Sequence, residues 1–266
     1  MRIIVLGARG FVGSAVYGVL SAGAECVGVD VDNYEAYRGQ RCEVLVNVNG
    51  NSKKYLAAQD PALEFDLSVR SVVRSIFDFP AERYVYISTV DVYTDFASAQ
   101  LTVEDAEIDV ARQSPYGFHK WLAEQYVRKH ARGWLILRLG GMVGRGLRKG
   151  PIYDLLHDVP LRVHLDSRYQ YIPTRTVGEV IRHLLMRGVE QEVYNVCGTG
   201  TVSLREVRDW LGKSGQENEE LVREHYEINN SKLRAVYPVP ETQASVKAFL
   251  EEVKGGGCLL YTSDAA

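Results

Sequence analysis

Short apolar runs alternate along this chain with stretches of helical periodicity. The runs at 2–6, 25–29, 44–48 and 83–87 are rich in branched or aromatic residues, as is typical of strands buried on both faces of a parallel sheet. Long helices are predicted at 61–79 and 115–132. Because strands and helices alternate to about Val143, we expect an α/β fold with a doubly wound parallel sheet.

The pattern changes after Gly144, where glycine or proline stands at positions 146, 150, 151 and 160. This punctuation predicts loops and a short helix, and residues 161–165 and 169–172 are expected to pair as short strands. A further helix is predicted to begin at the capping box of residues 203–206, Ser-Leu-Arg-Glu.

These changes of pattern divide the chain. We predict a larger unit over residues 1–143 and about 168–197, and a small C-terminal lobe over 144–167 and 198–254. Residues 255–266 lose all periodicity. We interpret them as a non-native or disordered tail, derived from a vector or an assembly step, and exclude them from the fold.

A glycine-rich turn follows the first apolar run and reads Gly-Ala-Arg-Gly-Phe-Val-Gly over residues 7–13. Gly7 allows the sharp turn, Gly10 allows the backbone to approach a pyrophosphate, and Gly13 allows the next helix to pack close to the strand. The phosphates would lie at the helix N-terminus beside Phe11 and Val12. The turn predicts a Rossmann-like, dinucleotide-binding larger unit.

The choice of dinucleotide depends on the residue that ends the second strand, Asp30. An acidic side chain at this place accepts hydrogen bonds from the adenosine ribose and repels a 2′-phosphate. NAD is therefore the expected cofactor. Arg9, inside the glycine turn, could reach a 2′-phosphate, so NADP stays open.

Tyr116 is the only tyrosine of the chain with a lysine four residues later, Lys120. If Ser114 caps a helix and Pro115 takes its first position, the two side chains lie one turn apart on one face. A nearby ammonium favours the phenolate, so we expect the pKa of Tyr116 to be lowered and the pair to transfer protons.

The strand at 83–87 leads into Ser-Thr-Val-Asp-Val-Tyr at 88–93, at the end where ligands of parallel sheets bind. With the glycine turn and the Pro-Tyr-Gly-x-x-Lys-x-x-x-Glu segment at 115–124, this sequence resembles the extended short-chain dehydrogenases/reductases, the group of nucleotide-sugar epimerases and dehydratases. Residues 137–144 resemble the strand and loop that line the nicotinamide pocket of that family. The resemblance spans residues 1–250.

The resemblance implies that Tyr116 is the acid/base, Lys120 its electrostatic partner and a ligand of the cofactor ribose, and Thr89 the hydroxyl that binds the reacting oxygen. A hydride leaves or reaches a carbinol carbon only while its oxygen loses or gains a proton, so both hydroxyls must bear on that oxygen. The same positions imply further cofactor contacts at Asn47, Asn49 and Gly140, and Tyr116 is itself expected to contact the cofactor.

Three departures from the family pattern concern the adenine pocket and the substrate. Residues 30–43 are too few for the usual helix, strand and turn, so we expect one strand to be missing or vestigial. In the dehydratases the threonine is followed by Asp-Glu, but here Asp91 stands alone, either as a second acid/base or as a loop carboxylate held by backbone N–H groups. Tyr169 replaces the family's diphosphate-binding arginine, which leaves Arg168 and Arg175 as candidates for an anionic substrate.

Composition adds exclusions. The 266 residues are 46% hydrophobic and carry a net charge of −3, which suits a globular core and gives no sign of a nucleic-acid partner. We expect no membrane partner and no signal peptide, because no apolar run is long enough to span a bilayer and the first strand starts at Arg2. Four cysteines without CxxC spacing indicate reduced thiols and a cytoplasmic protein. The dispersed histidines predict no metal site, and His119 is expected on the helix surface.

We therefore expect an enzyme, an NAD(P)-dependent oxidoreductase or epimerase acting on a small-molecule substrate, a sugar or nucleotide sugar. Retained NAD would serve an epimerase, whereas NADPH would serve a keto-sugar reductase, the first alternative. A second alternative, of another class, is a non-catalytic NAD(P)-binding sensor or assembly subunit. The resemblance also implies a homodimer formed through the two long helices.

Overall fold

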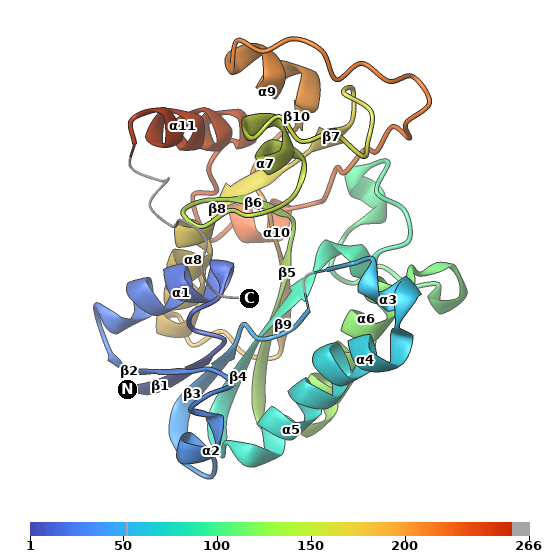
Figure 1. Cartoon of the computed structure of the whole chain (residues 1–266). Helices are drawn as coiled ribbons and strands as arrows, with labels where there is room; N and C mark the ends of the chain where they lie inside the picture. The colour runs from blue at the N-terminus through green and yellow to red at the C-terminus, as the bar shows by residue number, and fades with distance from the viewer. Residues whose placement is uncertain (52, 257–266) are drawn as a thin grey trace.

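The computed structural model describes residues 1–51 and 53–256 of the chain. Its centre is a six-stranded sheet in which every neighbouring pair is parallel, in the order β2-β1-β3-β4-β5-β9 (Figure 1). The strands are β1 (Arg2–Leu6), β2 (Glu25–Val29), β3 (Cys42–Asn47), β4 (Ala81–Thr89), β5 (Gly133–Leu139) and β9 (Glu192–Val196). The expected doubly wound α/β fold is confirmed.

Helices cover both faces of this sheet (Figure 1). On one face Ile3 and Val5 of β1 pack with Val16 and with Ile181, which belong to α1 (Phe11–Ser21) and α8 (Thr174–Met186). On the other face the alternate residues of β1 pack with residues of α5 (Ser71–Asp78) and α6 (Pro115–His130), and α4 (Pro61–Phe65) lies against α6. Burial on both faces explains why the strands read as continuous apolar runs.

The sheet ends at β2, as the short segment after it predicted. Between β2 and β3 the chain forms only the one-turn helix α2 (Tyr34–Tyr37), so the strand that would lie outside β2 is missing.

The second long helix was predicted accurately, whereas the first is interrupted. Its described segments are α4, a π-helical turn at Asp66–Arg70 and α5, preceded by the short α3 (Leu56–Gln59). A π turn inserts one extra residue into the helical ladder, which changes the direction in which the following side chains point.

A smaller apolar cluster lies above the sheet in Figure 1 and includes Leu155, Leu165, Val207 and Phe249. Its elements are β6 (Gly141–Val143), α7 (Pro151–Leu156), β7 (Arg168–Tyr169), β8 (Tyr171–Pro173), β10 (Val202–Ser203), α9 (Leu204–Trp210) and α11 (Thr242–Lys254). The short α10 (Ser231–Arg234) instead packs with the core of the sheet through Leu233. The capping box at Ser203 is present.

The predicted pairing of 161–165 with 169–172 is wrong. β7 pairs with β10 and β8 pairs with β6. Residues 161–165 form bends and a turn instead of a strand, because Leu161 and Leu165 are buried in the smaller apolar cluster. The division of the chain into domains stays a prediction. Of the predicted tail, residues 257–266 lie outside the described residues.

Within the described part of the chain, no helix has both the length and the apolar character that crossing a membrane requires.

Gly13 is expected to tolerate no side chain. A Cβ there would lie 1.8 Å from the Gly7 carbonyl oxygen, whereas a Cβ on Gly18, one to two turns later in α1, would meet nothing within 4 Å. Gly13→Ala should destabilise the fold by about 1–3 kcal/mol, and Gly18→Ala should stabilise it by about 0.5–1 kcal/mol. Urea denaturation of both variants checks this, and equal effects would contradict it.

Candidate active site

The candidate residues gather at the carboxyl ends of β1, β3 and β4. The strand order reverses between β1 and β3, and such a switch point is where open α/β sheets form a ligand crevice. The turn after β1, the loop after β3 and the turn after β4 all open on this edge.

The glycine turn has the geometry that a dinucleotide needs. Gly7 has a φ of +78° and its amide donates to the Val29 carbonyl at 2.8 Å. Gly10 is the N-cap of α1 and has no side chain to cap the helix. A Cβ on Gly13 would occupy the space of the Gly7 carbonyl. Phe11 and Val12 form the first turn of α1, so these residues fit a pyrophosphate held at a helix N-terminus.

Asp30 lies directly beside this turn, and Arg9 contacts it. The Arg9 amide donates to Asp30 Oδ1 at 3.3 Å and its Nε lies 3.1 Å from Asp30 Oδ2. The same guanidinium also bonds Asp32. Asp30, which favours NAD, and Arg9, which could favour NADP, thus form one cluster.

Tyr116 and Lys120 stand on the first turns of α6 as predicted. The Ser114 hydroxyl accepts the Gly117 amide at 3.0 Å and Pro115 takes the first helical position. A Cβ on Gly117 would lie 2.0 Å from the Asp91 carbonyl, so glycine lets α6 press against the turn after β4. Tyr116 and Lys120 are both buried.

The expected direction of the Tyr116 pKa is wrong. Burial, followed by the nearby carboxylates of Asp91 and Glu64, raises the pKa of Tyr116. Lys120 does not offset this, because its Nζ donates to the Ile87 carbonyl at 2.9 Å and lies 4.5 Å from the centre of the Tyr86 ring. The Tyr116 hydroxyl donates to the Asn51 carbonyl at 3.2 Å, so the protein holds this phenol as an acid.

Asp91 joins Thr89 to two residues that the sequence did not single out. Its carboxylate accepts the Thr89 hydroxyl at 2.8 Å, Lys54 Nζ at 2.7 Å and the Tyr226 hydroxyl at 3.2 Å. Tyr226 stacks on Phe96 with ring centres 4.4 Å apart. Asp91 is therefore held by side chains instead of the backbone N–H groups of the loop-carboxylate alternative.

The three other predicted cofactor contacts, Asn47, Asn49 and Gly140, differ in burial and in their partners. The Asn47 side chain is buried, donates to the Tyr84 hydroxyl at 2.6 Å and accepts the Asn49 amide at 2.9 Å, so its polar atoms are used within the fold. Asn49 is exposed at the end of β3. Gly140 allows its segment to lie close to the segment of Cys197, since a Cβ on Gly140 would lie 2.9 Å from Cys197 Cβ.

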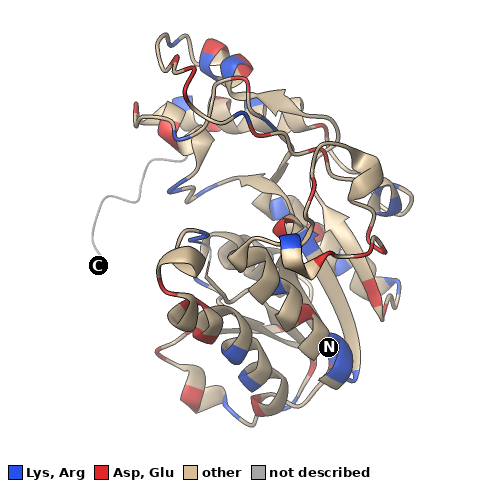
Figure 2. Cartoon of the chain, turned by 90° about the vertical axis from the view of Figure 1, so that its right-hand side faces the viewer, with Lys and Arg blue, Asp and Glu red and all other residues tan. Residues whose placement is uncertain are grey.

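The two candidate substrate arginines are each paired with a carboxylate. Arg168 Nη1 lies 3.6 Å from Glu206 in the smaller cluster, and Arg175 Nε lies 3.0 Å from Glu179 along α8. Neither guanidinium is paired with Asp91, although the Arg168 carbonyl accepts the amide of Tyr226, whose hydroxyl bonds Asp91. Figure 2 shows acidic and basic residues interspersed over the described chain.

His119 is buried, in contrast to the surface position expected for it. Its Nδ1 bonds Glu64 of α4, and the Ser68 hydroxyl bonds the same carboxylate. Glu64 is fully buried, so this pair fastens α4 to α6 behind Tyr116. The sequence around Glu64 contains no motif that would have predicted its pairing with His119.

A buried ion pair connects α6, which carries Tyr116, to the central sheet. Arg138 of β5 donates to Glu124 of α6 at 2.8 and 3.0 Å. Ser88 donates to the same carboxylate at 2.6 Å, and Tyr93 accepts from Arg138 at 2.9 Å and donates to Asn195. The network ties α6 to the ends of three strands.

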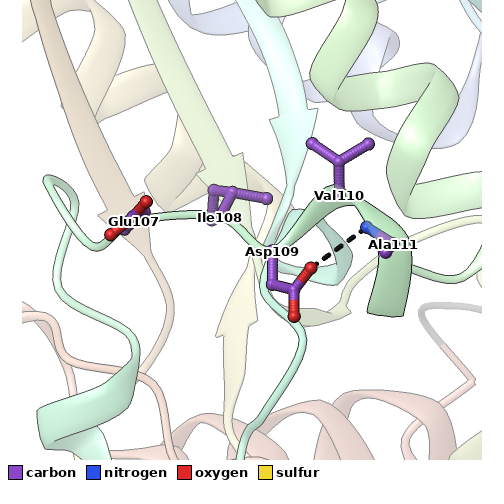
Figure 3. Close-up of a pocket in the computed structure, with 5 residues that line it drawn as sticks. All are labelled: Glu107, Ile108, Asp109, Val110 and Ala111. Atoms are coloured by element: carbon purple, nitrogen blue, oxygen red, sulfur yellow. Dashed lines mark hydrogen bonds between the residues drawn. The ribbon is translucent and has the colours of Figure 1, made fainter.

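A hollow of about 510 Å³ lies beside the loop before α6 and is lined by residues 107–111 (Figure 3). The Asp109 side chain there accepts the Ala111 amide at 3.2 Å. Thr89, Tyr116 and Lys120 do not line it, so it is separate from the candidate active site.

Lys120 should make stability depend on pH. Burial lowers the pKa of Lys120 from 10.5 to about 8. Below pH 8 both folded and unfolded chains carry the proton and folding bears the full cost of a buried charge. Between pH 8 and about 10 the unfolded chain still binds a proton that the folded chain has released, so stability rises with pH.

Lys120→Met is therefore expected to be more stable than the parent at pH 7, by on the order of 2 kcal/mol, with the difference shrinking by pH 10. Urea denaturation at both pH values measures this. The control, Lys129→Met, removes an exposed lysine from the same helix and should show no such dependence. A Lys120→Met variant that is less stable at pH 7 would contradict the expectation.

Comparison with known proteins adds the family. The sequence profile described as the NAD dependent epimerase/dehydratase family matches residues 3–211. Among curated proteins we found no match. A UDP-galactose 4-epimerase structure is 20% identical with a TM-score of 0.76, and the match covers 96% of this chain and 99% of that one.

Two further structures are similar. UDP-glucuronic acid 4-epimerase from Bacillus cereus, in complex with UDP-glucuronic acid and NAD, is 16% identical with a TM-score of 0.78 and coverage of 96% and 99%. RMD from Pseudomonas aeruginosa, complexed with NADPH, is 20% identical with a TM-score of 0.74 and coverage of 95% and 99%. At these identities the likeness establishes the fold.

Proposed function

The chain belongs to the NAD dependent epimerase/dehydratase family, and we propose that it is an NAD-dependent epimerase acting on a nucleotide sugar. The observation that carries this proposal is that α6, which carries Tyr116, packs on the turn that follows Thr89, at the sheet edge where the glycine turn also lies. α6 presses against the Asp91 backbone at Gly117, and Lys120 donates to the strand that ends in Thr89. The two hydroxyls therefore belong to one rigid unit.

A bound nicotinamide supplies the hydride acceptor and, when oxidised, a positive charge. In this proposal Tyr116 exchanges a proton with the sugar hydroxyl oxygen, which takes the place of the Asn51 carbonyl at the phenol. A positive charge beside Tyr116 would favour the phenolate, which burial and the nearby carboxylates disfavour. Thr89 binds the same oxygen while Asp91 holds its hydroxyl, and Lys120 orients the cofactor ribose.

A dehydratase would need a second carboxylate beside Thr89 to eliminate water. Asp91 is the one carboxylate in contact with Thr89 among the described residues, so no second carboxylate stands ready to assist water elimination. Epimerisation needs none, because the hydride is returned to the carbon from which it came.

The test is incubation of the purified protein, with NAD, with UDP-glucose, UDP-galactose and UDP-glucuronic acid, followed by proton NMR of the sugar. We expect slow loss of one epimer and gain of the other without net NADH. Net consumption of NADPH with a keto sugar would instead support a reductase. Cofactor binding without turnover of any sugar would support the sensor alternative.

We also propose a homodimer through α5 and α6. Phe77 on α5 and Tyr126 on α6 are 64% and 41% exposed, and both rings lie against His130. Exposed aromatic side chains on adjacent helices are typical of an interface. Size-exclusion chromatography with light scattering should give twice the monomer mass for the parent. Phe77→Lys should lower the measured mass toward that of the monomer.

The cysteines favour a reducing compartment, and we propose the cytoplasm. Cys26, Cys42 and Cys197 are free thiols, whereas Cys258 lies outside the described residues.

A further inference from the structure

The Arg9 side chain is held between two carboxylates at the end of β2. Its Nε lies 3.1 Å from Asp30 and its terminal nitrogen bonds Asp32. Asp30 is largely buried, with 16% of its side chain exposed, whereas Asp32 is 64% exposed. Arg9 thus bridges an inner and an outer carboxylate.

The backbone around this cluster is fixed. The Gly7 amide donates to the Val29 carbonyl at 2.8 Å, and a Cβ on Gly28 would lie 2.9 Å from Ala8 Cβ. The Asp30 amide donates to Asn33 Oδ1 at 2.7 Å. The glycine turn therefore leaves β1 in contact with the end of β2, and Arg9 leaves the turn toward the carboxylates.

The three charges sum to about −1 at the place where a Rossmann-like fold binds the adenosine ribose. Each carboxylate oxygen of Asp30 has two lone pairs, and those that Arg9 does not use suit ribose hydroxyls, which donate hydrogen bonds. A 2′-phosphate would add about two negative charges. Its natural partner, the guanidinium, is already engaged by two carboxylates, through Nε with Asp30 and Nη2 with Asp32, and carboxylates compete with phosphates for the same donors of arginine.

We propose that Asp32 selects NAD over NADP by holding Arg9 on the Asp30–Asp32 pair. Asp30 excludes the phosphate directly, and Asp32 withholds the one cation that could compensate. The proposal rests on the proposed function only in requiring that the chain binds a nicotinamide dinucleotide. It adds a residue, Asp32, that lies beyond the strand end and has no part in the chemistry.

The test is fluorescence titration of the whole chain with NADH and with NADPH, without any sugar. The parent should bind NADH at least about ten-fold more tightly. Asp32→Ala should tighten NADPH by about ten-fold and leave NADH within about two-fold. Added salt should narrow the parent's preference, because exposed charges are screened.

Arg9 must mediate the effect. In an Arg9→Ala background, Asp32→Ala should no longer improve NADPH binding, and this double-mutant cycle separates release of the arginine from simple loss of negative charge. Asp66→Ala is the matched control, since Asp66 also pairs with an exposed arginine, Arg70, away from the glycine turn. It should change neither affinity.

Three results would overturn the proposal: a parent that binds both dinucleotides equally, an Asp32→Ala variant without improved NADPH binding, or an equal improvement with and without Arg9. Because no sugar is present, failure of epimerase activity leaves these measurements unaffected. Absence of binding to either dinucleotide would remove both this proposal and the proposed function.

Discussion

Tyr116→Phe is expected to lower kcat for conversion of the nucleotide sugar by roughly 100- to 10,000-fold, the usual contribution of a positioned acid/base. The variant removes the group that exchanges a proton with the sugar oxygen in the proposed reaction. The measurement is initial rates on the UDP-sugar that the parent converts, together with NADH affinity from fluorescence.

The fold and the cofactor site should be unaffected, because only a hydroxyl bonded to the Asn51 carbonyl is lost. NADH affinity should stay within about two-fold of the parent, since the lost group adds no charge. Tyr126→Phe changes an exposed tyrosine on the same helix and should retain full activity. A Tyr116→Phe enzyme with more than about a tenth of the parent rate would exclude Tyr116 as the acid/base.

Arg138→Met is expected to cost about 3–5 kcal/mol of folding free energy, because it leaves the buried Glu124 carboxylate without its cation. Glu124 is fully buried and Arg138 is 3% exposed, so water cannot replace the lost partner. Urea denaturation at pH 7 measures the loss. Arg70→Met, which breaks an exposed pair with Asp66, should cost less than about 1 kcal/mol.

A double variant separates the ion pair from its desolvation. Glu124→Leu combined with Arg138→Met should be more stable than Arg138→Met alone, because no uncompensated charge remains buried. A double variant that is less stable than the single one would contradict this, and would mean that Glu124 stabilises the fold through another partner, such as the Ser88 hydroxyl.

Local features of the site could be read from the sequence. The glycine turn, the Ser114 cap and the strand end at Thr89 each depend on residues within one turn or strand of one another, and all three are present. The residues that form each feature are neighbours in the sequence, so the sequence pattern alone predicts it.

The features that were missed depend on partners far apart in the chain. Asp91 meets Lys54 and Tyr226 through three different segments, and His119 meets Glu64 across two helices. Burial among such partners reversed the expected pKa shift of Tyr116, because desolvation cannot be inferred from a spacing of four residues.

The same separation has a consequence for the protein during its synthesis. Asn195 and Tyr226 reach Tyr93 and Asp91 from 102 and 135 residues away. Since translation proceeds from the N-terminus, Thr89 and Tyr116 leave the ribosome well before these partners exist. A nascent chain therefore completes the candidate active site only once the segment containing Tyr226 has emerged, and chains released earlier are expected to be inactive.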